Sequence, residues 1–365
     1  MSTTPAANDA SKGVSIQKTF SRHFEPITAI SWSPNGRFLA SGSVDETVKV
    51  WDADEGNLHW TIGGHIEPIN CIAWSTDSQV VATGSRNLRL FDISTKEYLR
   101  TIVQEQPRLR ALSWSPNGAL LASASGSGVC LWEPQTGELK RRLTGFASIV
   151  ECLSWSPDSK VIASSSQNQV WLWDTLSGKV IRKFSGHSRA VLSLAWSPDG
   201  QILSSGSEDT TISLWDTKNW RQFAILEGHT AEVKGLSFSH DGVLLASESR
   251  DVRLWRCDDW DQVAVLKVPE PENWSTGLSF RPKSESLATL GPGTRSIRLW
   301  KLDLAALIGA VSASSSVRYT NAKVVLVGDT GVGKSGLGLV LSDPPFRATD
   351  STHNRKVWTF DNKNA

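Results

Sequence analysis

Short runs of alternating apolar and polar residues recur along most of the chain, and turn-forming residues bound each run. The clearest stretch, residues 186–216, contains three such runs, separated by turns at Pro198-Asp199-Gly200 and at Glu208-Asp209. Alternation over the length of a strand predicts a half-buried strand, so this stretch predicts a small antiparallel sheet. One such sheet cannot bury both of its faces, whereas several copies packed side by side can.

Two aromatic positions give the period of this pattern. One closes the first run of each copy, 40 to 42 residues apart, at Trp32, Trp74, Trp114, Trp155, Trp196, Phe238 and Phe280. The other closes the third run, at Trp51, Phe91, Trp132, Trp173, Trp215, Trp255 and Trp300. A step of about 40–45 residues, with Gly-His and Trp-Asp pairs, is typical of a propeller blade. The chain therefore resembles the WD-repeat family over residues 14–301. This resemblance implies an all-β, seven-bladed β-propeller of four-stranded antiparallel blades.

The segment 16–23 resembles the segment 180–187, which we interpret as the outer strand of one blade leading into the next. No comparable strand follows the last repeat at Trp300-Lys301. We therefore expect residues 14–20 to complete the last blade and close the ring, as is known for WD-repeat propellers, because closure removes open sheet edges. Residues 1–13 are small and polar, which predicts a disordered N-terminus.

The first and fifth copies carry the same four side chains at the same spacing. They are His23, Ser41, Asp45 and Trp51 in the first copy, and His187, Ser205, Asp209 and Trp215 in the fifth. A Ser, a His and an Asp together suggest a nucleophilic triad, but a triad that occurs twice in one ring would be odd. The resemblance to WD-repeat proteins implies instead a buried hydrogen-bond network, and we assign no catalytic residue to the propeller. The other copies depart from this pattern, so we expect apolar packing to hold them together.

Composition and charge narrow the possible partners. The net charge is +1, with acids and bases interspersed, which argues against nucleic acid and anionic membranes. The four cysteines lack metal-site spacing and predict buried, reduced thiols. No apolar run approaches the roughly 20 residues that cross a bilayer, and the N-terminus lacks a signal core. We expect a cytoplasmic monomer whose propeller needs no cofactor and binds one or more protein partners. Trp274, between Pro and Glu residues in a loop, is a candidate interaction anchor.

The composition changes after the propeller. Residues 302–320 predict a short helix and a flexible serine-rich linker. The apolar run 323–327 then leads into a GxxxxGK[ST] motif and a predicted helix, the context that phosphate binding by this motif requires. The predicted nucleotide-binding residues are Gly328, Asp329, Thr330, Gly331, Val332, Gly333, Lys334, Ser335 and Gly336. Backbone N–H groups would surround the phosphates, Lys334 would neutralise them, and Ser335 would ligate Mg²⁺.

Residues 321–365 further resemble the start of Ras/Rab-type small GTPases. The resemblance implies GTP or GDP and Mg²⁺ as ligands of a completed domain, with Thr352 as a second Mg²⁺ ligand. However, His353-Asn354 follows where the family has an aliphatic residue and Gly. The family's DxxG, NKxD and SAK segments are absent, so guanine specificity rests on resemblance alone. We therefore expect a truncated gene product or a fragment of a longer propeller–GTPase protein, with weak or no nucleotide binding by this chain.

Three functions compete at this point. The first is a protein-interaction scaffold coupled to a GTP-binding domain that acts as a switch. The alternative is a protein-binding propeller whose GTPase remnant is inert. An enzyme with its active site on the propeller has little support, because no unexplained cluster of acids, bases or metal ligands occurs in the sequence.

Overall fold

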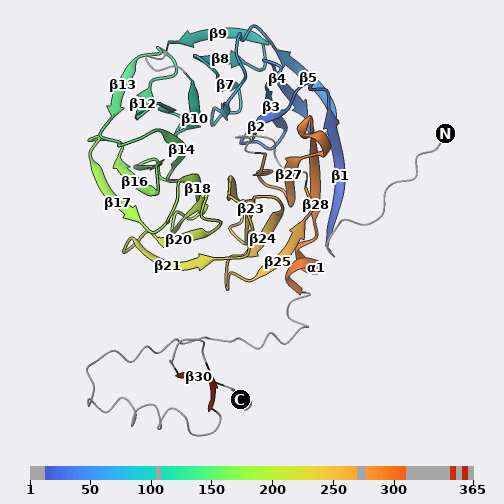
Figure 1. Cartoon of the computed structure of the whole chain (residues 1–365). Helices are drawn as coiled ribbons and strands as arrows, with labels where there is room; N and C mark the ends of the chain where they lie inside the picture. Colours follow the sequence, from blue (N-terminus) through green and yellow to red (C-terminus); the bar gives the residue numbers. More distant parts are fainter. Residues whose placement is uncertain (1–12, 104–107, 269–276, 310–345, 351–355, 361–365) are drawn as a thin grey trace, which may run out of the picture. The chain divides into compact units, whose positions relative to one another are not determined.

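Seven four-stranded antiparallel sheets stand side by side in a ring (Figure 1), in the part of the chain that the structure describes. The computed structural model describes residues 13–103, 108–268, 277–309, 346–350 and 356–360. In six of the sheets, or blades, the strands follow one another in chain order from the centre of the ring outward. The predicted seven-bladed propeller is confirmed.

The strands of each blade are as follows, from the innermost to the outermost. Blade 1 contains β2 (Ile27–Trp32), β3 (Phe38–Ser43), β4 (Val48–Asp52) and β5 (Asn57–Ile62). Blade 2 contains β6 (Cys71–Trp74), β7 (Val80–Gly84), β8 (Leu88–Asp92) and β9 (Glu97–Ile102). Blade 3 contains β10 (Leu109–Trp114), β11 (Leu121–Ser125), β12 (Gly128–Trp132) and β13 (Leu139–Leu143). Blade 4 contains β14 (Val150–Trp155), β15 (Val161–Ser166), β16 (Gln169–Asp174) and β17 (Val180–Ser185). Blade 5 contains β18 (Val191–Trp196), β19 (Ile202–Ser207), β20 (Ile212–Asp216) and β21 (Arg221–Leu226). Blade 6 contains β22 (Gly235–Phe238), β23 (Leu244–Glu248), β24 (Val252–Arg256) and β25 (Gln262–Leu266). Blade 7 contains β26 (Ser279–Phe280), β27 (Ser286–Leu290), β28 (Ser296–Leu302) and β1 (Val14–Ser21), and the 3₁₀ turn η1 (Pro292–Thr294) joins β27 to β28.

The first strand of the chain closes the ring. β1 pairs antiparallel with β28, from Val14 opposite Leu302 to Ser21 opposite Ser296, with one register shift between Ile16 and Lys18. β1 is therefore the outer strand of blade 7, and the predicted closure is confirmed. A hydrogen bond of 3.2 Å from Trp32 Nε1 in blade 1 to the carbonyl of Ser279 in blade 7 ties the inner strands across the same seam.

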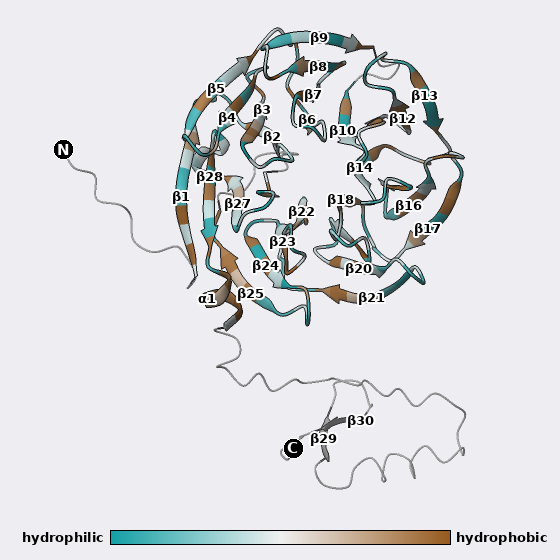
Figure 2. Cartoon of the chain, turned by 180° about the vertical axis from the view of Figure 1, so that it is seen from behind, coloured by the Kyte–Doolittle hydropathy of each residue, from teal (hydrophilic) through white to brown (hydrophobic). Residues whose placement is uncertain are grey.

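The hydrophobic core lies between the blades. Each of the seven clusters of buried apolar side chains draws on two neighbouring blades. At the seam between blades 7 and 1, Phe20 packs on Trp51 with ring centroids 5.3 Å apart, next to Leu299. Middle strands such as β3 and β4 are buried along their whole length, because a neighbouring blade covers each of their faces. Outer strands mix apolar and polar residues, as Figure 2 shows. Each large buried side chain contributes about 1.5–3 kcal/mol.

Connections between the strands alternate between two faces of the ring, because neighbouring strands run in opposite directions. In blade 1, residues 22–26 and the hairpin 44–47 lie on one face, where the backbone N–H of Val44 donates to the carbonyl of Pro26 at 2.9 Å. We call this the His face, because His23 and its counterparts begin the corresponding loops. The turns 33–37 and 53–56 lie on the opposite face, which we call the turn face.

The helix α1 (Leu304–Gly309) follows β28, as predicted, and its Leu307 is buried against the core shared by blades 6 and 7. Residues 312–365 form a separate unit, in which β29 (Phe346–Asp350) pairs antiparallel with β30 (Lys356–Phe360). The predicted phosphate-binding residues 328–336 and Thr352 lie outside the described residues, as do residues 1–12 and the linker. The nucleotide and Mg²⁺ sites therefore stay predictions.

Candidate functional site on the His face

Buried networks of four side chains support the His face. In blade 5, His187 Nδ1 lies 3.0 Å from Asp209 Oδ2 and His187 Nε2 lies 2.8 Å from Ser205 Oγ. Trp215 Nε1 donates to the same Ser205 Oγ at 2.9 Å. Blade 1 repeats this arrangement, with its three distances at 2.8, 2.8 and 2.9 Å between His23, Asp45, Ser41 and Trp51. The predicted hydrogen-bond network is therefore present in both blades.

The aspartate of each network holds the loop in front of it. Asp209 Oδ2 accepts the backbone N–H of Ser188 at 2.9 Å, and Oδ1 accepts the backbone N–H of Thr211 at 3.0 Å. Burial opposes ionisation of Asp209, but hydrogen bonds from the Thr211 hydroxyl and from the Ser188 N–H lower the pKa of its carboxyl to about 2. Ser205 is fully buried and bonded to both rings. Its hydroxyl therefore cannot reach a substrate, and this set of residues fixes loops in place.

Blade 6 contains part of the same network, which was not predicted from the sequence. His229 Nε2 lies 2.7 Å from Ser247 Oγ, and Trp255 Nε1 donates to Ser247 at 2.8 Å. Asp251 Oδ1 lies 3.0 Å from His229 Nδ1, but the geometry of this contact is not that of a hydrogen bond. The hairpin of blade 6 is two residues shorter, which hid the pattern, but the spacing of 22 residues from His229 to Asp251 matches that in blade 1.

The bond from the closing Trp to a hydroxyl also recurs in blades 3, 4 and 7, from Trp132 to Ser123, Trp173 to Ser164 and Trp300 to Thr289. Our expectation that apolar packing mainly holds these blades together was therefore incomplete.

Two exposed apolar side chains stand on the loops of blades 1 and 2. Phe24 is 79% exposed and Ile66 is 71% exposed, and each directly follows the histidine that begins its loop. The corresponding residues of blades 5 and 6 are polar, Ser188 and Thr230. Val44, on the hairpin between the two loops, is 38% exposed. These exposed residues were not predicted from the sequence, although an apolar residue at a position that is polar in other blades was a usable signal.

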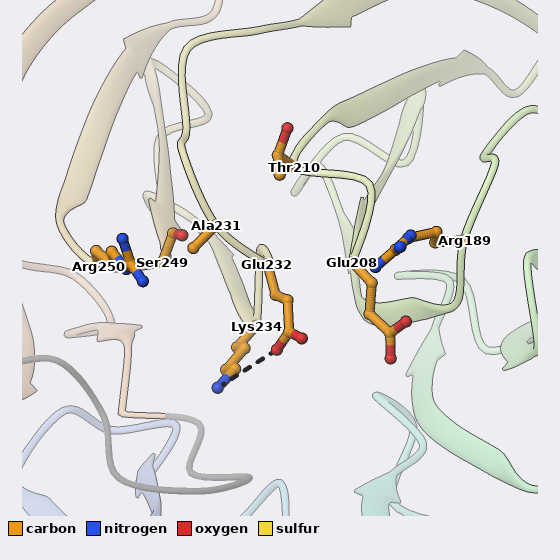
Figure 3. A pocket seen from close by; sticks show the side chains of 8 residues that line it. All are labelled: Arg189, Glu208, Thr210, Ala231, Glu232, Lys234, Ser249 and Arg250. Atoms are coloured by element: carbon orange, nitrogen blue, oxygen red, sulfur yellow. Dashed lines mark ion pairs between the residues drawn. The ribbon is translucent and has the colours of Figure 1, made fainter.

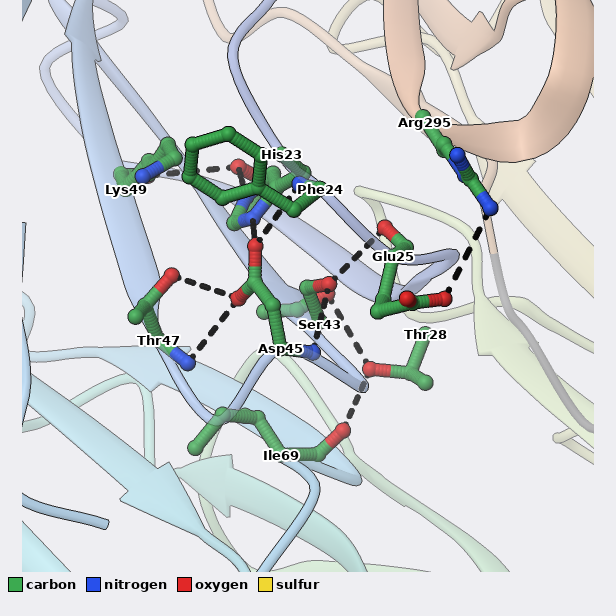
Figure 4. A network of polar contacts seen from close by, with 12 residues as sticks. His23, Phe24, Glu25, Thr28, Ser43, Asp45, Thr47, Lys49, Ile69 and Arg295 are labelled. Atoms are coloured by element: carbon green, nitrogen blue, oxygen red, sulfur yellow. Dashed lines mark hydrogen bonds and ion pairs between the residues drawn. The ribbon is translucent and has the colours of Figure 1, made fainter.

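A cleft of about 540 Å³ opens beside Phe24, where blade 7 meets blade 1. It is lined by Ser21, Arg22, His23, Phe24, Lys49, Pro292, Arg295 and Ser296. Figure 4 shows Phe24 and Lys49 beside the His23–Asp45 pair, with Arg295 extending from the neighbouring blade toward Glu25. Arg295 Nη2 and Glu25 Oε2 are 3.6 Å apart, and both side chains are more than half exposed. Solvent screening makes such a pair weak.

A second hollow of about 390 Å³ lies on the His face between blades 5 and 6. Figure 3 shows Arg189 and Glu208 on one side and Arg250 on the other, with Lys234 and Glu232 paired at 3.5 Å between them. Because positive and negative groups alternate around it, this hollow has no strong preference for one sign of charge.

The turn face has a hollow of about 510 Å³ between blades 1, 2 and 3. Three tryptophans contribute to its lining, Trp32, Trp74 and Trp114. The indole N–H groups of Trp32 and Trp74 donate to backbone carbonyls of the preceding blades, whereas that of Trp114 is buried without an acceptor in the described residues.

The remaining predicted residues have different outcomes. Trp274 lies outside the described residues, so its role as an anchor stays a prediction. Among tryptophans outside the repeat pattern, Trp220 packs between blades, with its ring centroid 6.0 Å from that of Phe184 and 5.9 Å from that of Trp196. Trp171 stacks on Trp173 with ring centroids 5.7 Å apart. The four cysteines are free thiols, two buried and two half-buried.

Metal-binding clusters and membrane-spanning helices are both absent from the ranges that the structure describes. No group of three or more His, Cys, Asp or Glu side chains there is arranged to hold a metal ion. No helix in those ranges has the length and apolar character needed to span a membrane.

Six segments of the chain match the WD domain, G-beta repeat family (WD40), at residues 14–52, 56–92, 96–133, 137–174, 178–216 and 220–256. Each segment takes the outer strand of one blade and the first three strands of the next. Among similar proteins, Protein tipD of Dictyostelium discoideum is 28% identical over 119 residues, which is 30% of this chain and 19% of that protein. Small ribosomal subunit protein RACK1 of Schizosaccharomyces pombe is 28% identical over 118 residues, 30% of this chain and 38% of that protein. Transcriptional corepressor LEUNIG_HOMOLOG of Arabidopsis thaliana is 28% identical over 172 residues, 35% of this chain and 22% of that protein. The chain thus spans less than two fifths of the length of each of these relatives.

Proposed function

Because this chain belongs to the WD-repeat family, we propose that it is a protein-interaction scaffold that binds a partner protein through its His face. WD-repeat propellers typically bind protein partners, and such an assignment from a shared fold is an analogy that needs support from a site. The observation that carries the proposal is a set of three exposed apolar residues, Phe24 and Ile66 on two neighbouring loops and Val44 on the hairpin between them, which we call the apolar patch.

The patch is suited to binding because its loops are held in place. Asp45 accepts the backbone N–H of Phe24 at 3.1 Å, and the backbone N–H of Ile69 donates to the carbonyl of Ser43 at 3.1 Å. Single exposed apolar residues are common on protein surfaces, but apolar residues grouped on fixed loops are typical of interaction sites. A loop that is already ordered loses little conformational entropy on binding, so more of the contact energy appears as affinity.

The test adds the tagged full chain, or one of two variants, to an extract of the source organism. Bound proteins are cross-linked to the chain and identified by mass spectrometry. The double variant Phe24→Glu, Ile66→Glu places charge in the patch, whereas Leu176→Glu changes a residue of the turn face that is 85% exposed. We expect specific cross-linked proteins for the wild-type chain and for Leu176→Glu, and their loss from the double variant. If the double variant keeps the same cross-links with an unchanged denaturation midpoint, the His face is not the binding face.

A second candidate couples the scaffold to nucleotide binding by residues 321–365. The supporting observation is the motif at residues 328–335, directly after the apolar run 323–327. A fluorescent GTP analogue, titrated onto the full chain and onto Lys334→Ala in the presence of Mg²⁺, separates the two functions. The scaffold alone predicts no saturable binding, whereas submicromolar affinity that is lost in Lys334→Ala would establish the second function.

A further inference from the structure

We infer that the cleft between blades 7 and 1 binds the carboxylate of an acidic peptide segment in a partner protein, with an apolar residue next to that carboxylate packed on Phe24. This inference rests on the proposed function and names the chemistry of the partner. Its basis is a buried lysine without a counter-ion, in a cleft whose other charged side chains are also positive.

Lys49 lies on β4 and lines the cleft, although only 6% of the residue is exposed. Its ammonium group has no hydrogen-bond or ion-pair partner within the described ranges. Lysines are rarely this buried unless they are paired, because removing a charge from water is costly. An anion that enters the cleft would therefore meet a lysine whose side chain is already fixed and largely enclosed by protein.

Basic residues at the same strand position in blades 2 and 6 have hydrogen-bond or ion-pair partners, and the one in blade 7, Arg298, lies 5.9 Å from the ring centroid of Trp300. Lys49 stands opposite Ser41 in the ladder, as Arg89 stands opposite Thr83 in blade 2 and Arg253 opposite Ser247 in blade 6. The guanidinium of Arg89 donates to the carbonyl of Gly64 at 2.6 Å. That of Arg253 pairs with Asp251 at 3.1 Å and donates to Gln262 at 2.7 Å. Only the lysine of blade 1 faces open space among these three basic residues.

The other residues that line the cleft make its charge positive. Arg22 and Arg295 add two cations at the rim, and no carboxylate lines the cleft. Two acids stand close by. Asp45 is bonded to His23 at 2.8 Å and accepts the backbone N–H of Phe24 at 3.1 Å, and Glu25 makes only the exposed, screened contact with Arg295 at 3.6 Å. His23 does not add to this charge, because burial, the largest effect, lowers its pKa despite the bond to Asp45. The cleft is therefore complementary to an anion.

The apolar and the buried parts of the cleft favour a peptide carboxylate among possible anions. Phe24 supplies a large exposed ring beside the cations, which favours an acidic group adjacent to an apolar side chain. Nucleic acid is disfavoured, because it requires an extended basic stripe, whereas this chain has a net charge of +1. The single charge of Lys49 matches the single charge of an Asp or Glu side chain.

The test uses the full chain and an array of immobilised hexapeptides, Gly-Ser-X-Glu-Gly-Ser, in which X is each of the twenty amino acids. The dissociation constant of the best peptide is then measured by fluorescence anisotropy, next to versions with Gln or phosphoserine in place of Glu. We expect binding where X is apolar, and affinity at least ten-fold weaker for the Gln version and for Lys49→Met. Lys49→Met has the length and apolar stem of lysine without its charge, and Lys218→Met, which removes an exposed charge on the turn face, is its control.

Each outcome decides the question. Equal binding by Lys49→Met and wild type, equal binding of the Gln version, binding of the phosphoserine version alone, or no binding by any peptide would overturn the inference. Arg22→Gln, a change at the exposed rim, replaces Lys49→Met if the latter alters the denaturation midpoint. If acidic peptides fail while the cross-links that depend on Phe24 and Ile66 persist, only this inference is wrong. The proposed function is judged separately, by whether the double variant Phe24→Glu, Ile66→Glu loses the cross-links that the wild-type chain forms.

Discussion

Two adjacent buried serines allow the energetic role of the His–Ser–Trp network to be measured. Ser205 accepts the indole N–H of Trp215 at 2.9 Å and bonds to His187 Nε2 at 2.8 Å. Because His187 Nδ1 faces the ionised Asp209, Nδ1 carries the proton and Ser205 donates to Nε2. Ser204, also fully buried, makes one hydrogen bond, from its hydroxyl to the carbonyl of Ala195 at 3.0 Å.

The change Ser205→Ala leaves two buried ring nitrogens without partners, in Trp215 and in His187. An unsatisfied buried polar group costs about 1–3 kcal/mol, so the free energy of unfolding should fall by about 2–6 kcal/mol. Ser204→Ala loses one hydrogen bond between neutral groups and should cost about 1 kcal/mol. The two variants delete the same hydroxyl group one residue apart, so their difference isolates the network.

The measurement is urea denaturation followed by tryptophan fluorescence, with midpoints compared at unchanged m-values. The further variant Trp215→Phe removes the N–H that Ser205 accepts, so Ser205→Ala should cost less in that background. Blade 2 shows that the fold accommodates this ring, because Phe91 stands where blade 5 has Trp215. Equal midpoints for Ser205→Ala and Ser204→Ala would refute this account of the network.

Three further predictions concern other parts of the ring. Burial raises the pKa of the Glu248 carboxyl to about 7 from 4.5, so the folded chain loses stability as pH rises through this interval. Glu248→Gln lacks that titration, so the urea midpoint of the variant minus that of the wild type should increase from pH 5 to pH 8. A difference that stays the same at both pH values would contradict the prediction. Lys283 adopts a left-handed backbone (φ 57°) in the turn between β26 and β27, a conformation that glycine adopts more easily than other residues. Lys283→Gly should therefore raise the free energy of unfolding by up to about 1 kcal/mol, and a lower urea midpoint would count against it. Deletion of β1 exposes the edge of β28, so size-exclusion chromatography should show oligomers, and a stable monomer would speak against closure as the protecting device.

The sequence predicted the ring well because its evidence was repeated. Two aromatic positions recur seven times with the same spacing of about 40–45 residues. The likeness of residues 16–23 to residues 180–187 indicated the closing strand. The network of blade 6 was missed because its hairpin is two residues shorter, although the spacing from His229 to Asp251 was preserved.

The cleft could not be found from the sequence in the same way. Arg22, Lys49 and Arg295 come from three segments, and pairing of β1 with β28 brings the first and last of these together. Residues so far apart in the sequence form no motif with a fixed spacing. The burial of Lys49 was also hidden, because basic residues stand at the same strand position in other blades and find partners there.

Ring closure also fixes an order of events during synthesis. Val14 emerges first but pairs with Leu302, 288 residues later, so at about 5–20 residues per second it waits roughly 15–60 s for its neighbour. During that interval the nascent chain is an open arc, and any helper protein that shields it must leave before the last blade can form. The cleft that we assign to an acidic ligand exists only after this final step, so a partner that reads it would recognise finished molecules and ignore unfinished ones.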